Sequence, residues 1–199
     1  MRSMPSTPTP LRPTGDDAAD ELLQTNPLAL MTGMLLDQQV AIEWAFAGPL
    51  KLQSRLAERG LSLDAETLAA MSEDDVVALF VEKPALHRYP AVMARRAKAM
   101  AEHIVEHHDG DPARVWLEAE DAGALRRRLM AVPGYGKDKT RIFIALLAKR
   151  FGVTPDGWAD EAGRLAEEGF NSVADLDGPE AVAALREHRA ALTAARKKA

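Results

Sequence analysis

The chain has 199 residues, with 25 Lys and Arg against 30 Asp and Glu, so its formal charge is −5. This length suits one globular domain, or two small lobes around a cleft. Because the chain has no cysteine, it can form no disulfide, thiolate nucleophile, cysteine-bound zinc site or cysteine-held iron–sulfur cluster. Any catalysis must use carboxylate, amine, hydroxyl, imidazole or bound-water chemistry. The acidic balance, taken alone, argues against a nucleic-acid partner.

The apolar runs and the N-terminal residues indicate whether the protein enters a membrane or is exported. The longest nearly apolar run, residues 28–36, is too short to cross a membrane, and the N-terminus has no apolar signal core. We therefore expect a soluble, cytoplasmic protein without a membrane partner. Four prolines lie among Ser and Thr in residues 1–15, a composition that predicts a disordered tail before one helical domain over residues 16–199.

Apolar spacing from Asp16 onward is helical, and no segment alternates with a period of two, so the chain is predicted to be all-α. Asn26 and Ser72 are expected to cap the helices that follow them. Residues 83–89 are expected to form a connector. The predicted helices cover residues 26–38, 40–59, 64–71, 73–82, 90–110, 121–131, 137–150, 158–168 and 179–198.

Residues 129–148, LMAVPGYGKDKTRIFIALLA, form the most informative stretch. They predict a helix, a four-residue turn and a second helix that carries Lys137, Lys139 and Arg141 near its start. Gly134 and Gly136 let another molecule approach the main chain closely. The second helix begins with unsatisfied N–H groups, which bind anions, and the lysines make phosphate the expected anion. An ordinary αα-hairpin with a glycine turn is the alternative.

Three segments, in the same order along the chain, resemble a known family. Residues 132–136, VPGYG, are similar to the hairpin of the helix-hairpin-helix (HhH-GPD) DNA glycosylases, which include endonuclease III and the adenine glycosylase MutY. Residues 35–40, LLDQQV, resemble the glutamine segment of that family, and residues 89–100, YPAVMARRAKAM, resemble its aromatic-then-basic helix start. The resemblance covers residues 26–160 and looks closest to small bacterial HhH-GPD-type base excision repair proteins.

The resemblance implies an all-α, two-lobed fold with double-stranded DNA, carrying a damaged base, in the cleft. The hairpin would hold the backbone of the damaged strand; its residues are Pro133, Gly134, Tyr135 and Gly136. The resemblance allows a monovalent cation at the hairpin carbonyls, and no other cofactor is expected. The missing cysteines indicate the branch of the family without an iron–sulfur cluster. In this role the protein would be a bacterial, nucleoid-associated monomer.

The distribution of charge supports a nucleic-acid partner. Residues 83–100 hold five bases and no acid, and residues 126–150 hold eight bases and one acid. These segments sum to +12, which leaves −17 for the remainder. A basic face on an acidic body is suited to phosphates; solvent-facing arginines on amphipathic helices are the alternative. The expected DNA-binding side chains are Arg95, Arg96, Lys98, Lys137, Lys139 and Arg141.

For the chemistry, the resemblance implies an aspartate after the hairpin that stabilises the sugar as the base departs. Asp156 is the first candidate and Asp160 the second, although an Asp beside Pro and Gly is also an ordinary turn residue. Bifunctional members have a lysine two residues after the second hairpin glycine, where this chain has Asp138. Lys139 is one place further on, about 100° around the helix. A monofunctional glycosylase is therefore expected, with Lys139 as a remote candidate.

A glycosylase must also hold an extruded base. By resemblance, Gln38 and Gln39 would fill the gap in the duplex or contact the opposite base, although they also suit a helix end. Leu86 or Tyr89 could act as an intercalating wedge. Each aromatic side chain that could stack on the base is more typical of the core; these side chains are Trp44, Phe46, Tyr135 and Trp158.

Two other functions stay open. Asp138 at the lysine position, and the unusual surroundings of Asp156, fit a catalytically inactive DNA-binding protein of the same fold. His103, Glu106 and His107 match the H-x-x-E-H pattern of zinc-dependent hydrolases. That pattern lies near the end of a helix, where histidines are favoured by the dipole, and it lacks a well-directed third ligand.

Overall fold

The computed structural model of the chain describes residues 9–196, and all regular secondary structure in this range is helical, which confirms the predicted all-α fold. The elements are α1 (Asp17–Thr25), α2 (Pro27–Leu36), α3 (Ile42–Ala57), α4 (Ala65–Ala70), α5 (Glu73–Val81), α6 (Pro90–His108), α7 (Arg114–Leu117), α8 (Ala122–Ala131), α9 (Lys137–Phe151), α10 (Trp158–Ala162), the 3₁₀ helices η1 (Gly163–Ala166) and η2 (Val173–Asp175), and α11 (Pro179–Arg196). None of the described helices is both long and apolar enough to cross a membrane.

Helix starts follow the predicted caps closely. Asn26 accepts a hydrogen bond from the N–H of Ala29, and Ser72 caps α5 in the same way. Asp16 caps α1, a helix that the sequence indicated only through its spacing, and the short α7 was not expected. The helix predicted over residues 158–168 is divided at Gly163, which has a φ of +60°. Residues 197 and 198 of the last predicted helix lie outside the described range.

The described part of the N-terminal segment, residues 9–15, packs against the domain. Leu11 is fully buried, and Pro13 is also buried. The N–H of Arg12 donates to the carbonyl of Leu176, and the Thr14 hydroxyl donates to the Asp20 carboxylate at 2.7 Å. The predicted disordered tail is therefore corrected over this stretch, because a leucine and a proline within it fill apolar space. Residues 1–8 of that prediction lie outside the described range.

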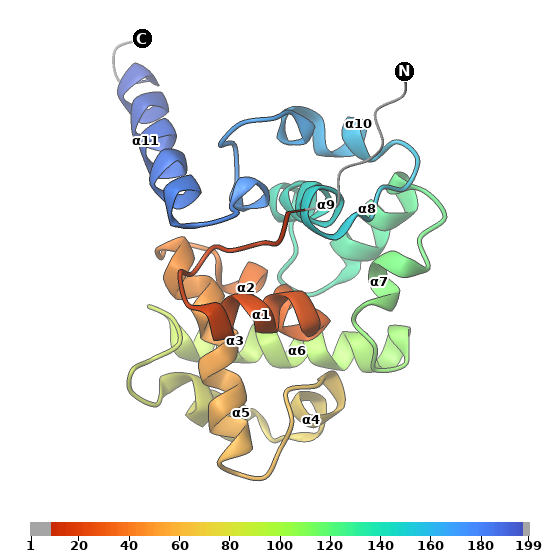
Figure 1. Ribbon diagram of the computed structural model, residues 1–199. Coiled ribbons are helices and arrows are strands. Elements are labelled where there is room, and N and C mark those ends of the chain that lie inside the picture. Colours follow the sequence, from red (N-terminus) through yellow and green to blue (C-terminus); the bar gives the residue numbers. More distant parts are fainter. Residues whose placement is uncertain (1–8, 197–199) are drawn as a thin grey trace.

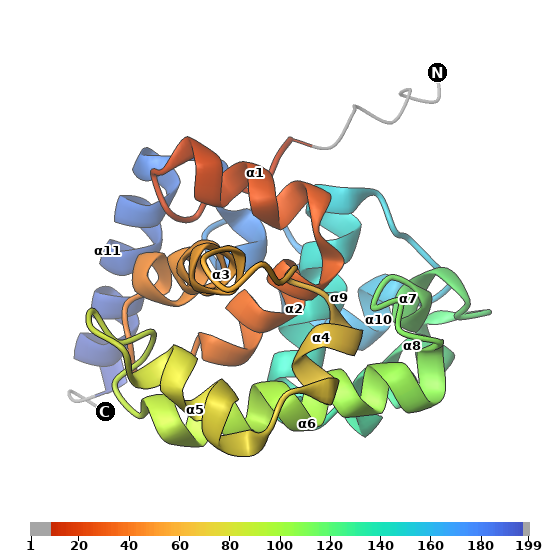
Figure 2. The same cartoon turned by 90° about the horizontal axis from the view of Figure 1, so that it is seen from below.

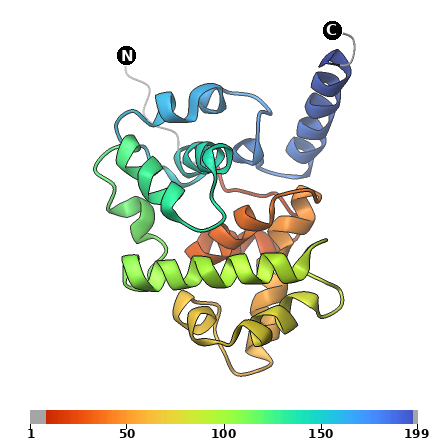
Figure 3. The same cartoon turned by 180° about the vertical axis from the view of Figure 1, so that it is seen from behind.

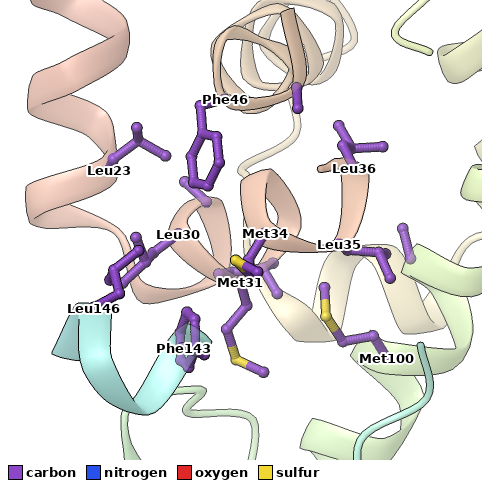
Figure 4. Close-up of a cluster of buried hydrophobic side chains, with 14 of the residues drawn as sticks. Leu23, Leu30, Met31, Met34, Leu35, Leu36, Phe46, Met100, Phe143 and Leu146 are labelled. Carbon is purple, nitrogen blue, oxygen red and sulfur yellow. The ribbon is translucent and has the colours of Figure 1, made fainter. Parts of the chain in front are cut away.

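Helix α2 is the centre of the core. Its sequence, PLALMTGMLL, is hydrophobic on every side, and residues 28–36 are all buried. A helix without a polar face has to be enclosed by other elements. Figure 4 shows its leucines and methionines packed against Phe46 of α3, Met100 of α6 and Phe143 of α9. Helix α2 thus packs against α3, α6 and α9 at once.

The remaining helices form two groups on either side of α6 (Figure 1). Helices α4 and α5 pack on α6, while α8, α9 and α10 pack on one another. Seen from behind, α6 crosses the molecule between these groups (Figure 3), and the view from below places α4 and α5 along its length (Figure 2). Both groups contribute to one continuous hydrophobic cluster.

Candidate nucleic-acid interface

The hairpin between α8 and α9 is docked on the C-terminal end of α2. Gly134 has a φ of +89°, and a Cβ at this position would overlap the Cδ1 atom of Leu35. Gly136 has a φ of −85° and serves as the N-cap of α9. An added Cβ on Gly136 would have no heavy atom within 4 Å. Gly134 is thus needed for packing, whereas Gly136 leaves the start of α9 open.

Tyr135 anchors the hairpin in the core. Its side chain is 4% exposed, and its hydroxyl donates to the carbonyl of Met31 at 2.9 Å. Its ring meets the ring of Phe143 edge-on, with 5.6 Å between centroids. Burial raises the pKa of Tyr135 well above its usual value. Tyr135, considered above as a stacking surface, therefore holds the hairpin in place and is closed to a base.

Lys139 ties α9 to the same end of α2. Its ammonium donates to the carbonyl of Met34, and it lies 3.5 Å from the carbonyl of Leu35 and 3.4 Å from that of Asp37. Burial lowers the pKa of Lys139 to about 8; the Asp37 carboxylate opposes this shift and the Arg96 guanidinium adds to it. A cation at the negative end of a helix dipole satisfies carbonyls that have no partner within the helix.

Gln38 lies directly after α2 and connects it to α6. Its amide donates to the Leu35 carbonyl at 2.8 Å and approaches the Met93 sulfur at 3.3 Å. Its side-chain oxygen accepts a hydrogen bond from Arg96 at 2.9 Å. The next residue, Gln39, is exposed and has a φ of +58°. The glutamine segment, the hairpin and the start of α6 thus meet at one place.

His87, which the sequence analysis did not single out, joins this junction. The side chain is 1% exposed. Its Nε2 atom lies 2.9 Å from the Gln38 carbonyl, and its Nδ1 atom accepts from the N–H of Tyr89 at 3.0 Å. Asp37, also at the junction, was missed as well. Two signals in the sequence could have indicated them: Asp37 directly precedes Gln38, and His87 lies two residues before Tyr89.

Two aromatic rings flank His87 at the surface. Trp44 is 38% exposed and its indole N–H donates to the Ala85 carbonyl at 3.3 Å. Tyr89 is 43% exposed, and the Arg88 guanidinium lies over its ring at 5.4 Å. The His87 ring centroid is 6.5 Å from that of Trp44 and 6.1 Å from that of Tyr89. Both outer side chains are partly exposed, so they are accessible aromatic groups at this site.

The other apolar side chains considered for the base site are placed differently. Phe46 and Leu86 are fully buried in the core. Leu86 therefore cannot serve as a wedge in this conformation, which corrects that expectation and leaves Tyr89. Trp158 is half-buried against the core at the start of α10, next to α8 and α9 and away from the junction.

Several predicted DNA-binding bases already have partners within the protein. Lys98 donates to the carbonyls of Ala69 and Met71 at the end of α4. Arg95 pairs with the exposed Glu73 at 2.7 Å, and Arg141 donates to a carbonyl of α10 at 3.3 Å. Lys137 is exposed and makes no ion pair or hydrogen bond within the described residues. The positive charge available to a ligand is therefore smaller than the sequence count.

Asp156, the first candidate for the catalytic aspartate, lies at the far end of α8 from the hairpin turn. The Asp156 carbonyl accepts from the N–H of Ala122, the first residue of α8, at 3.0 Å. The turn that holds Gly134 follows the last residue of this ten-residue helix, about 15 Å away along the helix axis. Asp160 is exposed in the first turn of α10. The Asp156 backbone is therefore held at the end of α8 that is opposite to the hairpin turn.

The histidines of the H-x-x-E-H pattern gather at the end of α6. The rings of His103 and His107 have centroids 4.5 Å apart, and His108 is buried beside Arg128. Burial is the largest cause that lowers the pKa of His103 and of His108. Across residues 9–196 no three His, Asp or Glu side chains are arranged to hold a metal ion.

The exposed groups around the junction define what we call the α2-end face, which consists of Gln39, Trp44, Arg88, Tyr89, Arg96, Gly136 and Lys137. It combines open aromatic rings, cations and the free amides at the start of α9. Comparisons of the chain with protein-family models, with curated proteins and with solved structures gave no match.

Proposed function

We propose that this chain binds double-stranded DNA through the α2-end face and acts in base excision repair as a monofunctional DNA glycosylase. The observation that carries the proposal is the convergence of three distant segments on the end of α2. Gly134 packs on Leu35, Arg96 binds Gln38, and Lys139 binds the last carbonyls of α2. The two-lobed arrangement around the duplex belongs to this proposal.

The chemistry of the face suits a nucleic acid. Gly136 caps α9 without a side chain that occupies its first amides, so these N–H groups can bind a phosphate. Lys137 stands next to them, and the hydrogen bond that Arg96 makes within the described residues goes to the neutral amide of Gln38. The rings of Trp44 and Tyr89 offer stacking surfaces for a base, which is worth about 1–3 kcal/mol for each base.

The position of Asp156 favours a second candidate function, a DNA-binding protein without base-excision chemistry. The Asp156 backbone lies at the end of α8 opposite to the hairpin turn, and Asp138 occupies the position of the family's lysine. The two candidates share the interface and differ only in whether a glycosidic bond is cleaved.

Binding is tested first. The full chain should bind a duplex with affinity that falls steeply as salt increases. Lys137→Ala should weaken binding several-fold and reduce the salt slope by about one. Arg164→Ala, which removes an exposed cation from η1, is the matched control and should change neither quantity. Salt-insensitive binding, or equal effects of the two variants, would contradict the proposed interface.

Catalysis is tested with duplexes that each carry one alkylated, deaminated or oxidised base, followed by alkaline cleavage at any abasic site. Release of one base class supports the glycosylase. Tight binding without release of any base supports the second candidate. Asp156→Asn and Asp160→Asn test the two candidate aspartates, and Asp37→Asn tests the carboxylate at the junction itself. The variant that loses base release while it retains DNA binding identifies the catalytic group.

A further inference from the structure

A small pocket lies between α9 and η1 and shares no residue with the α2-end face. The side chains that α9 contributes to it are three and four residues apart, so they lie on one face of the helix. Lys139, which contacts α2, is not among them. The pocket has a volume of about 220 Å³ and is lined by Asp138, Arg141, Ile142, Arg164, Leu165 and Asn171.

Gly163 makes room for the guanidinium group of Arg141 in this pocket. A Cβ on Gly163 would overlap the Nη2 atom of Arg141, and its φ of +60° with a ψ of −137° is a conformation that favours glycine. The Nη2 atom donates to the Ala162 carbonyl at 3.3 Å, which holds the guanidinium group against the backbone of α10. Arg141 forms no ion pair within the described residues. Most of its five N–H groups therefore remain available to a ligand.

The other polar side chains of the pocket also lack partners in the part of the chain that the structure describes. The Arg164 guanidinium group is exposed and makes no hydrogen bond or ion pair there. The backbone N–H of Asn171 donates to Asp175 at 2.8 Å, which holds this residue in place, while its side-chain amide is unpaired. The Asp138 carboxylate is exposed and unpaired as well. The pocket thus presents two arginine charges that no carboxylate of the protein pairs with.

This combination of groups defines the chemistry of a ligand. Guanidinium groups bind phosphate through paired N–H groups, and two of them are present. Asp138 would repel a bare phosphate, but it accepts a hydrogen bond from a hydroxyl group of the same ligand. Ile142 and Leu165 provide an apolar wall for a short carbon skeleton. Pockets for drug-sized ligands have volumes of about 300–1,000 Å³, so this smaller pocket suits a molecule of a few carbon atoms.

We propose that this pocket binds a small phosphomonoester that carries a hydroxyl group: the phosphate contacts Arg141 and Arg164, and the hydroxyl group donates to Asp138. The site is separate from the proposed DNA interface, and it binds its ligand whether or not the chain binds DNA. Glycerol 3-phosphate is a simple molecule of this class and serves as the probe. Methyl phosphate, which has the phosphate without a hydroxyl group on its carbon, is the matched comparison.

Titrations of the full chain followed by ¹H–¹⁵N NMR give the two dissociation constants. They are made at constant ionic strength and at about pH 7.5, where a phosphomonoester carries close to two negative charges. Signals from the residues that line the pocket should shift and saturate with both compounds. Glycerol 3-phosphate should bind about tenfold more tightly than methyl phosphate, the effect of one hydrogen bond to a charged group. The absence of saturable shifts with either compound overturns the proposal.

Two variants separate the roles of the charged groups. Arg164→Ala should weaken the binding of both compounds about tenfold. Asp138→Ala should bind methyl phosphate at least as tightly as the wild type and lose the preference for glycerol 3-phosphate. Arg127→Ala, which removes an exposed arginine of α8 outside the pocket, is the matched control and should behave as the wild type does. Equal affinities in Arg164→Ala and this control overturn the site, and a preference that survives in Asp138→Ala overturns the assigned ligand class.

A competition experiment distinguishes this site from the proposed DNA interface. At constant ionic strength, saturating glycerol 3-phosphate should leave the affinity for a duplex unchanged. Displacement of the probe by the duplex would assign the pocket to the DNA interface and overturn a separate site. A chain that binds the probe but no duplex would support this inference while the proposed function fails.

Discussion

The two ends of α9 are similarly basic in sequence but differ in what their cations do. At the C-terminal end, Lys149 pairs with Asp175 at 2.6 Å and donates to the Glu167 carbonyl. Arg150 donates to the Ala174 carbonyl and approaches Asp177. At the N-terminal end, Lys137 is exposed next to the open amides of the helix. The positive charge is used for folding at one end and is available for a ligand at the other.

This difference shows why charge counted along a segment does not locate a binding face. A cation that satisfies carbonyls or a buried carboxylate contributes little to attraction at the surface, because its field is largely cancelled nearby. Lys139 shows that a cation in a basic segment can still be unavailable to a ligand. It belongs to the basic N-terminal end of α9, yet its ammonium lies on the carbonyls of α2. Four variants test how the side chains around α9 are used.

Gly134→Ala should have the largest effect, a loss of about 3 kcal/mol in the free energy of unfolding. The new Cβ would overlap Leu35, and the left-handed backbone would be strained. Gly136→Ala is the matched control, since its position is open and its φ is −85°. Urea unfolding of both variants is the measurement. Equal losses at the two glycines would show that the hairpin is not docked on α2.

Lys149→Met should lose about 2 kcal/mol of unfolding free energy, because it leaves the buried Asp175 carboxylate with only its backbone donors. The two side chains are 15% and 7% exposed. DNA affinity at fixed salt should not change, in contrast to Lys137→Ala. Urea unfolding and duplex binding are measured on the same preparation. A weakened affinity in a folded Lys149→Met protein would extend the interface along the whole of α9.

Lys139→Met should remove a pH dependence on the order of 1–2 kcal/mol. The pKa of Lys139 in the folded protein is about 8, below the value of an exposed lysine, so the unfolded chain binds more protons between these values. The cost of burying the charge is present below pH 8 and is lost as pH rises. The unfolding free energy of the wild type should therefore increase relative to the variant between pH 7 and pH 9.5. Lys137→Met should behave as the wild type does, and a constant difference would contradict the burial of Lys139.

Tyr135→Phe should have the smallest effect, about 1 kcal/mol, through the lost hydrogen bond to Met31. Burial raises the pKa of Tyr135, so the unfolded chain releases this proton first and the wild type loses stability as pH rises above 10. The phenylalanine variant should lose less stability over that range. Unfolding at pH 8 and pH 10.5 measures both effects. An unchanged pH dependence would mean that the hydroxyl is accessible to solvent.

Much of the fold was predictable because it depends on local signals. Asn26 and Ser72 mark helix starts by their side-chain chemistry, and the structure confirms these two caps. The uniformly apolar sequence of α2 determines its burial. The boundary at Gly163 and the packing of Leu11 were not predictable from local signals, because they depend on contacts with distant segments.

The candidate site was predictable only as separate segments. The sequence identified Gln38, Arg96 and the hairpin but could not show that they meet, because Gln38 and Lys139 are about a hundred residues apart in the chain. His87 and Asp37 gave no pattern of their own. The sequence indicates Asp156 only by its distance along the chain from the hairpin. Its position in the fold depends instead on residues 152–157, which lead from the end of α9 back to the start of α8.

The enclosure of α2 has a consequence for any ligand of this face. A helix with no outer surface cannot shift unless the core opens, so the groups fixed to its end form a template of constant shape. A duplex that binds there has to supply the deformation itself, by bending or unstacking at the contacted step. Sequences that distort easily should therefore be bound in preference to stiff ones, even where no base edge is read.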